Sequence, residues 1–397
     1  MVKEQRNKER VLREETEAEV QNNILPYWLA LRDYDHGGFY GRVDGDNRLH
    51  KDADKGAIYM CRILWTFSRA YRLFGKADYL DAAVAAKEFI FNKMIDHEYG
   101  GIYWAVSYCG SCIDGKKQSY AQGFAIYALS EYYRATGDRG ALDLAVEVFE
   151  LLERYAHDPV AGGYLEAFTK EWQPISDMRL SKKDDNEPKT MNTHLHILEP
   201  YTNLYLVWRD GGLGKKLTEL VEIFMDKIVD SSHHCGLFFD MNWRCMSHIT
   251  SYGHDIEAFW LIHEAIETLG NPMLKEKYSE KIKNIAYASF EGLDADGSMM
   301  YEKDISENKI DSERHWWVQA ETVVGCFYLY KYYGDVDALD KAVRCWAYIK
   351  MKVIDRSHGE WVWSVLENGE VNTKEDKAGF WKCPYHNGRC SFIINSL

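Results

Sequence analysis

Three residues along one predicted helix have side chains suited to sugar chemistry. His254, Glu257 and Trp260 are spaced three residues apart, so they lie on one face of a helix. Ser251 precedes them as a candidate N-cap. The imidazole can move protons near neutral pH, the carboxylate one turn away can orient it, and the indole can stack on a pyranose ring. The stripe also fits a helix that enters the core with a satisfied histidine–glutamate pair, so its meaning depends on the rest of the chain.

Similar polar and aromatic pairs open other predicted helices. Asn192 and His196 share a helix face because they are four residues apart. Trp317 and Glu321 have the same spacing. Further candidates lie near helix starts or close to the C-terminus, and they are Arg62, Tyr120, Trp381 and His386. Several such faces at one mouth of one structure indicate a binding site much more strongly than any single face does.

The sequence predicts no metal site. His194 and His196 are two residues apart, so they diverge by about 200° on a helix and cannot both ligate one ion. Residues 263–264 imitate the start of a zinc-binding H-E-x-x-H motif, but the second histidine is missing, and we interpret them as an exposed polar face. The C-x-x-C at residues 109–112 has no second pair, and we expect all nine cysteines to be reduced thiols.

A glycine followed by aromatic residues recurs six times at intervals of 61 to 73 residues, which indicates an internal repeat. Its copies are centred on Gly38, Gly101, Gly163, Gly236, Gly297 and Gly359. Between the copies the apolar spacing is helical. The predicted helices span 4–31, 59–74, 77–93, 121–136, 138–156, 192–209, 214–230, 254–269, 272–291, 316–333 and 336–354, with a short helix after His386.

Six helix pairs at a near-constant period can stack as an open solenoid or close into a ring. We predict the ring, an all-α (α/α)6 barrel of twelve helices with short β-hairpins in the loops. The first and last units look incomplete, as if the two termini complete one pair. The first helix of each pair is expected inside, and residues 1–397 form one domain. The longest non-helical insert, residues 163–190, contains the charged run 182–187, which is expected near the cleft as a solvated, mobile loop or a lid.

The composition narrows the class of ligand. The net charge of −14 argues against nucleic acid or an anionic membrane as a partner, because both need a basic face. No apolar run approaches membrane-spanning length, and the charged N-terminus lacks a signal-peptide core, so we expect a cytoplasmic protein. Aromatic residues make up 14% of the chain, which favours a cleft that stacks flat ligands over an average core.

Four segments resemble the cellobiose 2-epimerases, within the N-acylglucosamine 2-epimerase superfamily; they are residues 191–196, 251–257, 316–321 and 381–386. The resemblance implies an (α/α)6 barrel that epimerises the reducing-end glucose of β-1,4 disaccharides at C2 without a cofactor. It further implies that His254 and His386 transfer the proton and that His196 assists, in ring opening or as an additional acid or base. It places around the sugar Arg62, Asn192, Glu257, Trp317, Glu321 and Trp381.

Two residues depart from the pattern of that family. Pro200 stands where a small helix former is usual, and it removes the donor to the carbonyl of His196, which predicts a kink in this inner helix. Phe380 replaces the proline usual before Trp381, which predicts a shifted closing loop.

Inversion at C2 of an aldose needs an open-chain aldehyde, because only then is the C2 proton acidic. Two imidazoles on opposite walls can exchange that proton through an enediolate, and Arg62 can stabilise its oxygen. We expect a small sugar as the partner and a monomer or weak homodimer. Four alternatives remain open: a monosaccharide or N-acylglucosamine 2-epimerase, an aldose–ketose isomerase, an inverting glycosidase using Glu257 and Glu321 about 6.5–9.5 Å apart, and a non-catalytic sugar-binding protein.

Overall fold

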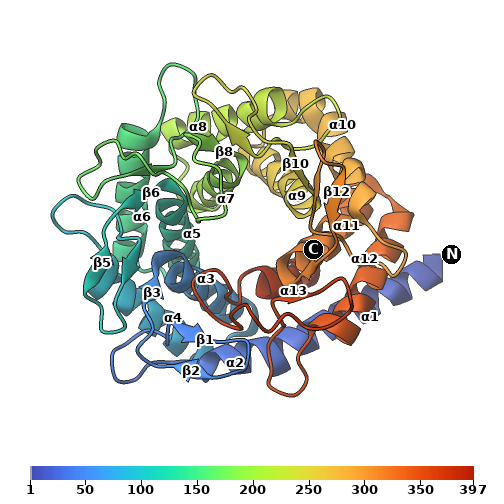
Figure 1. Ribbon diagram of the computed structural model, residues 1–397, viewed down its shortest axis with the longest axis horizontal. Helices are drawn as coiled ribbons and strands as arrows, with labels where there is room; N and C mark the ends of the chain where they lie inside the picture. Colours follow the sequence, from blue (N-terminus) through green and yellow to red (C-terminus); the bar gives the residue numbers. More distant parts are fainter. Residues whose placement is uncertain (1) are drawn as a thin grey trace.

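The computed structural model describes residues 2–397, and in this range twelve helices form a closed double ring (Figure 1). The inner ring consists of α3 (Ala57–Phe74), α5 (Ser119–Thr136), α7 (Met191–Val207), α9 (Tyr252–Leu269), α11 (Trp316–Tyr333) and α13 (His386–Ser396). The outer ring consists of α4 (Ala77–Phe89), α6 (Arg139–Leu151), α8 (Gly211–Ile223), α10 (Pro272–Ser289), α12 (Val336–Tyr348) and the N-terminal helix. The predicted (α/α)6 barrel is therefore confirmed.

The outer helices end in a characteristic way. The N-terminal helix runs as α1 (Val2–Glu19) through a wide π-helical turn (Val20–Ile24) into α2 (Leu25–Leu29). The same five-residue turn ends four other outer helices, at Ile90–Met94, Leu152–Ala156, Phe224–Ile228 and Ile349–Val353, and a 3-10 turn at Phe290–Gly292 ends α10.

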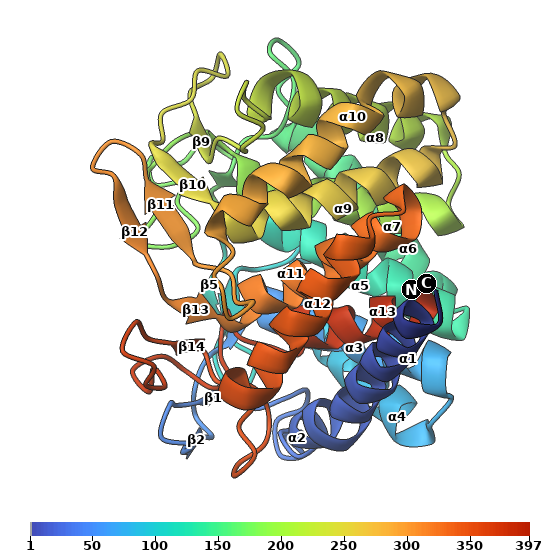
Figure 2. The ribbon, with the colours of Figure 1, turned by 90° about the vertical axis from the view of Figure 1, so that its right-hand side faces the viewer.

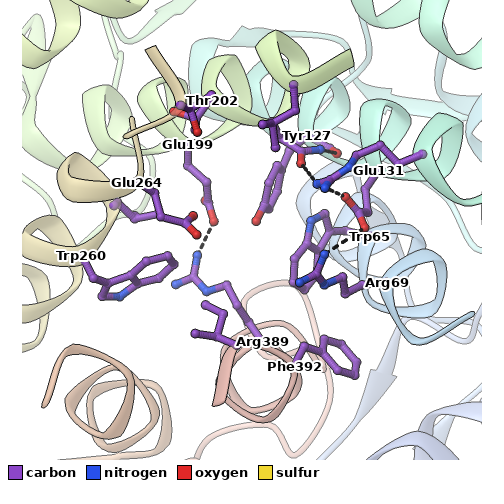
Figure 3. Close-up of a pocket in the computed structure, with 16 residues that line it drawn as sticks. Trp65, Arg69, Tyr127, Glu131, Glu199, Thr202, Trp260, Glu264, Arg389 and Phe392 are labelled. Atoms are coloured by element: carbon purple, nitrogen blue, oxygen red, sulfur yellow. Dashed lines mark hydrogen bonds and ion pairs between the residues drawn. The ribbon is translucent and has the colours of Figure 1, made fainter. Parts of the chain in front are cut away.

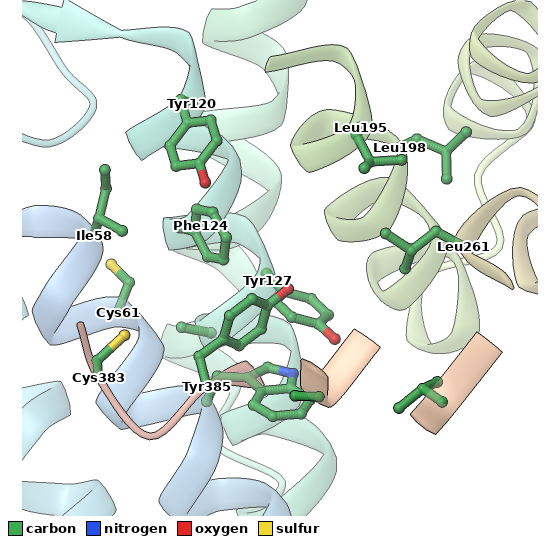
Figure 4. Close-up of a cluster of buried hydrophobic side chains, with 14 of the residues drawn as sticks. Ile58, Cys61, Tyr120, Phe124, Tyr127, Leu195, Leu198, Leu261, Cys383 and Tyr385 are labelled. Carbon is green, nitrogen blue, oxygen red and sulfur yellow. The ribbon is translucent and has the colours of Figure 1, made fainter. Parts of the chain in front are cut away.

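Burial explains which helix of each pair lies inside. The helix α5 is buried continuously from Ser119 to Tyr132, so it is covered on all sides. The outer helix α12 buries only one stripe of residues, including Leu339, Ala342 and Trp346. Aromatic rings fill the space where the inner helices meet the C-terminal segment, and Figure 4 shows Tyr120, Phe124, Tyr127 and Tyr385 in this cluster. The prediction that the first helix of each pair is internal is confirmed.

The two ends of the chain complete one helix pair. Helix α1 lies outside and α13 inside, and both termini are at the same end of the barrel (Figure 2). Ser391 of α13 donates a hydrogen bond of 2.8 Å to the carbonyl of Thr16 in α1. Between the inner and outer helix of a pair, Gly137 and Gly334 adopt φ angles of 76° and 71°, a left-handed conformation that glycine reaches without strain. A tight turn at glycine therefore joins the two helices of each of these pairs.

Short strands join neighbouring pairs on one face of the ring (Figure 2). They are β1 (Arg42–Val43), β2 (Leu49–His50), β3 (Lys55–Gly56), β4 (Ala105–Val106), β5 (Cys112–Asp114), β6 (Lys117–Gln118), β7 (Ala167–Phe168), β8 (Lys189–Thr190), β9 (Phe238–Phe239), β10 (Ile249–Ser251), β11 (Glu302–Asp304), β12 (Lys309–Asp311), β13 (Arg314–His315) and β14 (Ser364–Val365). The strand before one inner helix pairs antiparallel with a strand of the next unit, as β6 does with β7. A bridge between Val43 and Ala378 joins the first unit to the last.

A buried ion pair recurs under these strands. Asp96 follows an outer helix, and Lys117 precedes the next inner helix; their side chains are fully buried and 2.7 Å apart. Asp33–Lys55 and Asp158–Lys189 repeat the pair at the same distance. Asp96 also accepts bonds from two backbone amides, so the carboxylate fixes the turn while the ammonium ties the turn to the next unit.

No helix among the described residues is long and apolar enough to cross a membrane. All nine cysteines are free thiols, as predicted, and those at positions 109 and 112 are exposed.

The Asp96–Lys117 pair gives a stability prediction. Lys117→Met leaves the buried carboxylate of Asp96 without a counter-ion, and we expect the free energy of unfolding to fall by about 3–5 kcal/mol. Lys283→Met is the control, because the Lys283–Glu280 pair lies on the surface and its loss is expected to cost less than about 1 kcal/mol. Denaturant unfolding of the two variants measures the difference. Equal losses would show that the buried pair does not stabilise the ring.

Candidate active site

A cavity of about 440 Å³ opens at the strand-bearing face of the barrel. Its walls come from all six inner helices or the loops before them. Nine of the eleven predicted site residues line it, and they are Arg62, Tyr120, Asn192, His196, His254, Glu257, Trp317, Trp381 and His386. The ring thus brings together residues that are far apart in the sequence, although the roles assigned to them remain predictions.

The site residues occupy equivalent positions in the repeat. The sixth residue of α3, α7, α9 and α11 is respectively Arg62, His196, Glu257 and Glu321. The second residue of α5, α7 and α11 is respectively Tyr120, Asn192 and Trp317. Positions two and six are one helical turn apart, so the five inner helices that contribute these residues present one short stripe toward the axis of the ring, whereas α13 contributes its first residue, His386.

Each of the three candidate catalytic histidines is held through its Nδ1 atom. His386 contacts Glu321 Oε1 at 2.7 Å, and His196 contacts Glu199 Oε2 at 3.2 Å. A carboxylate accepts, so Nδ1 donates in both cases and Nε2 keeps its lone pair. His254 Nδ1 contacts the hydroxyl of Ser251 at 2.8 Å. All three rings therefore have Nε2 free for a substrate.

Ser251 is the N-cap residue of α9, as predicted, although its hydroxyl bonds to the imidazole of His254 and makes no capping bond. The expected partner of His254 is wrong. Glu257 does not orient His254, because its carboxylate contacts Arg389 at 2.5 Å. The serine does what the glutamate was expected to do.

His254 and His386 lie on either side of one indole. The ring centroid of Trp317 is 4.7 Å from that of His254 and 5.6 Å from that of His386. Burial, with the nearby His196, lowers the pKa of His254 to about 3. Burial also lowers the pKa of His386, with the positive charges of Arg389 and Arg62 acting in the same direction. Both rings are therefore biased toward the neutral, basic form in a shared cavity.

Below the histidines, Arg389 of α13 binds carboxylates from three other inner helices. Its Nη2 atom lies 2.5 Å from Glu257 Oε1 and 2.7 Å from Glu321 Oε1, and its Nη1 atom contacts Glu199. The guanidinium also lies over the indole of Trp260, 4.6 Å from the ring centroid. Figure 3 shows this layer from the opposite side, where Arg389, Glu199, Trp260 and Glu264 line a second cavity of about 150 Å³.

Arg389 and its three glutamates, Glu199, Glu257 and Glu321, form what we call the arginine layer. Within this layer the pKa values of Glu199 and Glu257 are shifted in opposite directions. Burial alone would raise the pKa of Glu199, but Arg389 and His196 lower it to about 2. Burial and the neighbouring Glu321 raise the pKa of Glu257 to about 7, although Arg389 opposes the shift. Glu257, Glu321 and His386 have a spacing that could hold a metal ion, but Arg389 Nη2 already contacts both carboxylates. The guanidinium of Arg389 therefore supplies the positive charge between these two carboxylates.

Two predicted sugar-contacting residues are placed elsewhere. Glu321 does not line the 440 Å³ cavity. Its carboxylate contacts Arg389 and the Nδ1 atom of His386, so it lies deeper in the barrel than the His386 ring. Trp260 lines the second cavity, and its Nε1 donates to Glu321 at 2.9 Å. The exposed face expected at residues 263–264 is also wrong: His263 is buried, and Glu264 accepts from Tyr328 and faces the second cavity. Trp260 is three residues beyond Glu257 and therefore about one turn deeper in the barrel.

The sequence reasoning missed several residues of the site. Tyr301, His315 and Trp363 line the cavity, and the rings of Tyr301 and His315 stack at 4.0 Å. Tyr301 and Trp363 belong to the repeated glycine–aromatic motif, which was a usable signal. Asp184 and its neighbours in the long insert also line the cavity, so the expected position of this insert near the cleft is confirmed. Arg389 was detectable as the residue one turn after His386.

The structure shows the kink expected from Pro200 and the packing of Phe380, while the shifted closing loop stays a prediction. Helix α7 is kinked at His196, whose φ of −90° and ψ of 16° are not helical, and this confirms the kink predicted from Pro200. Phe380 packs its ring 4.9 Å from that of Trp104 and 5.4 Å from that of Trp381. A side chain on Gly56 would come within 2.4 Å of the Phe380 ring, so this glycine makes room for the phenylalanine.

Comparison with known proteins agrees with this architecture. A family model described as N-acylglucosamine 2-epimerase (GlcNAc 2-epimerase) matches residues 38–390, and the chain belongs to this family. It is 52% identical over 381 residues to a cellobiose 2-epimerase of Bacteroides fragilis, across 96% of this chain and 97% of that protein. It is 41% identical over 387 residues to a cellobiose 2-epimerase of Ruminococcus albus, with coverage of 96% and 97%.

A solved structure gives the same result. The cellobiose 2-epimerase from Bacillus thermoamylovorans B4167 superposes with a TM-score of 0.94 at 42% identity, and the match covers 98% of this chain and 100% of that one. The closed ring of helix pairs is therefore that of a sugar epimerase.

The raised pKa of Glu257 predicts a pH dependence of stability. Its ordinary pKa is 4.5 and its folded pKa is about 7, so the folded state binds the proton more tightly and loses stability as the pH rises between these values. Glu257→Gln removes this loss. We therefore expect the Tm of the variant, relative to the unmodified protein, to increase from about pH 5 to about pH 8.

Glu307→Gln, at an exposed carboxylate, is the control for this measurement. Thermal unfolding of the three proteins in one buffer series measures the effect. A difference between Glu257→Gln and the unmodified protein that does not change with pH would contradict the raised pKa.

Proposed function

We propose that this chain is a cofactor-independent 2-epimerase that inverts C2 of the reducing-end glucose of a β-1,4-linked disaccharide, converting cellobiose to glucosyl-mannose and acting on lactose as well. The relatives with 52% and 41% identity are named cellobiose 2-epimerases, and the similarity extends over nearly the whole chain. A cytoplasmic location and a monomeric or weakly dimeric state belong to the same proposal.

The geometry around Trp317 carries the mechanism. The ring centroids of His254 and His386 lie within 5.6 Å of that of this indole, on α9 and α13, the two inner helices that flank α11, and each histidine keeps Nε2 free. A sugar placed against the indole has an imidazole near each face of its C2 atom. One imidazole takes the C2 proton of the open-chain aldose onto its Nε2 to leave an enediolate. The other imidazole, which must first gain a proton at Nε2 from solvent, delivers that proton to the opposite face of C2.

Buried polar atoms without partners support the proposed sugar site. Arg62 Nε, Asn192 Oδ1 and Glu257 Oε2 are buried and have no hydrogen-bond partner within residues 2–397, and all three residues line the cavity. Buried polar groups are rarely left unpaired, so these atoms are suited to the hydroxyl and carbonyl oxygens of a ligand. Arg62 remains charged and can stabilise the enediolate oxygen, while Tyr120 holds its Nη2 at 2.8 Å.

The room in the site favours a disaccharide. The 440 Å³ cavity adjoins an outer recess of about 600 Å³ on the same face of the barrel. Both are lined by Asn192, His254, Tyr301, His315 and Trp363. A single pyranose at Trp317 leaves this recess empty, whereas a second sugar can extend into it. A monosaccharide or N-acylglucosamine 2-epimerase is therefore the weaker alternative.

The inverting glycosidase fits the geometry poorly. Its two carboxylates should lie about 6.5–9.5 Å apart, with both facing the substrate. Glu257 and Glu321 instead contact the same nitrogen of Arg389, and Glu321 does not line the cavity. The aldose–ketose isomerase shares the enediolate and differs only in the carbon that is reprotonated, so it must be separated by experiment.

Incubation with cellobiose in D2O tests the proposal. We expect glucosyl-mannose carrying deuterium at C2, observed by NMR, because the reprotonating imidazole exchanges with solvent. His254→Ala and His386→Ala should each lower kcat by at least about 100-fold, because each removes one general acid or base. His97→Ala, at an exposed histidine, should keep full activity. Deuterium at C1 would indicate the isomerase, free glucose would indicate the glycosidase, and binding without turnover would leave only a sugar-binding protein.

A further inference from the structure

Pro200 interrupts the regular helix geometry of α7 at His196, which lines the cavity. Proline has no amide hydrogen, so residue 200 cannot donate to the carbonyl of His196 one turn earlier. The ψ angle of His196 is 16°, about 60° from the value of a regular helix. The peptide plane after His196 is therefore rotated, and its carbonyl oxygen leaves the direction of the helix axis.

The rotated carbonyl points at a glycine on the neighbouring inner helix. A Cβ atom built on Gly123 of α5 would lie 2.3 Å from the carbonyl oxygen of His196 and 3.5 Å from Cγ of Pro200. The first distance is far below a van der Waals contact, and the oxygen belongs to the backbone, so it cannot move aside as a flexible side chain can. The close approach of the two helices therefore requires glycine at position 123.

The ring of His196 rests on the same stretch of α5. Its centroid lies 4.9 Å from that of Tyr120 and 5.1 Å from that of Phe124, the residues on either side of Gly123 along this face. On its other side, Nδ1 contacts Glu199. The imidazole is thus fixed by the rings of α5 on one side and by Glu199 on the other. A shift of the His196 backbone relative to α5 would therefore rotate the imidazole.

We propose that Gly123 and Pro200 act as a pair that positions His196. The proline releases the carbonyl of His196, the glycine accommodates it, and together they set the direction in which Nε2 enters the cavity. This inference rests on the proposed function only in taking His196 as a participant in the reaction. Neither residue reaches the cavity itself, so both are positioning residues.

A double-mutant cycle tests the pair. Gly123→Ala alone drives a methyl group against the carbonyl, and we expect kcat to fall by about 10- to 100-fold, as misplacement by about 1 Å can cause. Pro200→Ala restores the amide donor and allows the carbonyl to return to the helix. It should raise Tm while lowering kcat, because the ring of His196 is re-aimed.

Coupling between the two changes is the decisive result. In the double variant the carbonyl is withdrawn from position 123, so the added methyl group costs little. We expect kcat of Gly123→Ala/Pro200→Ala to equal that of Pro200→Ala within about threefold, far above the product of the two single effects. If Gly123→Ala does not fold, a folded double variant shows the same rescue. If neither folds, wild-type kcat in Pro200→Ala overturns the proposal, and a lowered kcat together with a shifted His196 imidazole NMR resonance supports it.

Gly325→Ala provides the matched control. Gly325 also lies within an inner helix, and a Cβ atom there would come within 2.4 Å of a side-chain carbon of Ile256. Combined with Pro200→Ala, it should give multiplicative effects on kcat, because a Cβ at Gly325 meets Ile256 of α9, whereas Pro200 packs near Gly123 of α5. Multiplicative effects in the Gly123 cycle as well would overturn the pairing. Absence of epimerase activity in the unmodified protein would instead overturn the proposed function, so the two failures are distinguishable.

Discussion

The buried charge of Arg389 is the constraint on which the rest of the site depends. One guanidinium from the last helix meets carboxylates from α7, α9 and α11, and it is the main positive charge that offsets them in a layer shielded from water. A buried carboxylate without a counter-ion is costly, so the last helix must enter the ring in a fixed register. The same interaction that closes the barrel places His386, one turn before Arg389, at the wall of the cavity.

The arginine layer also determines how the imidazoles are held. Glu199 and Glu321 each bind Arg389 with one oxygen and accept from a histidine Nδ1 with an oxygen as well. Each histidine is therefore fixed in the tautomer that leaves Nε2 for the substrate. His254 lies farther from this layer and is held by a serine hydroxyl. The two members of the proposed proton-transfer pair thus have different partners, which gives the two faces of the substrate unlike environments.

The repeat explains how such a site can be built without long functional loops. Five of the six inner helices begin directly after a short strand, and α3, α5 and α7 are anchored there by a buried aspartate–lysine pair. With the starts fixed in this way, site residues at the second or sixth position of α3, α5, α7, α9 and α11 are directed toward the axis. Changing the side chains at these positions alters the chemistry and leaves the anchoring intact. The kink at His196 is a local exception. Here the backbone conformation, and not the identity of the side chain, sets the direction of the imidazole.

The sequence alone determined the helix pairs, their number and the closed ring, because periodic apolar residues and recurring glycines reflect local geometry that each unit repeats. It also determined most of the cavity lining, since equivalent positions in a ring must meet at its axis. The depth of each residue along that axis was decided only by the tertiary structure. Trp260 and Glu257 share a helix face, but Trp260 lies about one turn deeper. Glu257 therefore lines the 440 Å³ cavity, whereas Trp260 lines the second cavity beneath it.

Hydrogen-bond partners were likewise decided only by the fold. The spacing of His254 and Glu257 suggested a pair, but Glu257 binds Arg389, which is 132 residues away in the chain. A buried carboxylate pairs with the strongest donor that the packing brings near, and sequence spacing contains no information about groups that arrive from another helix.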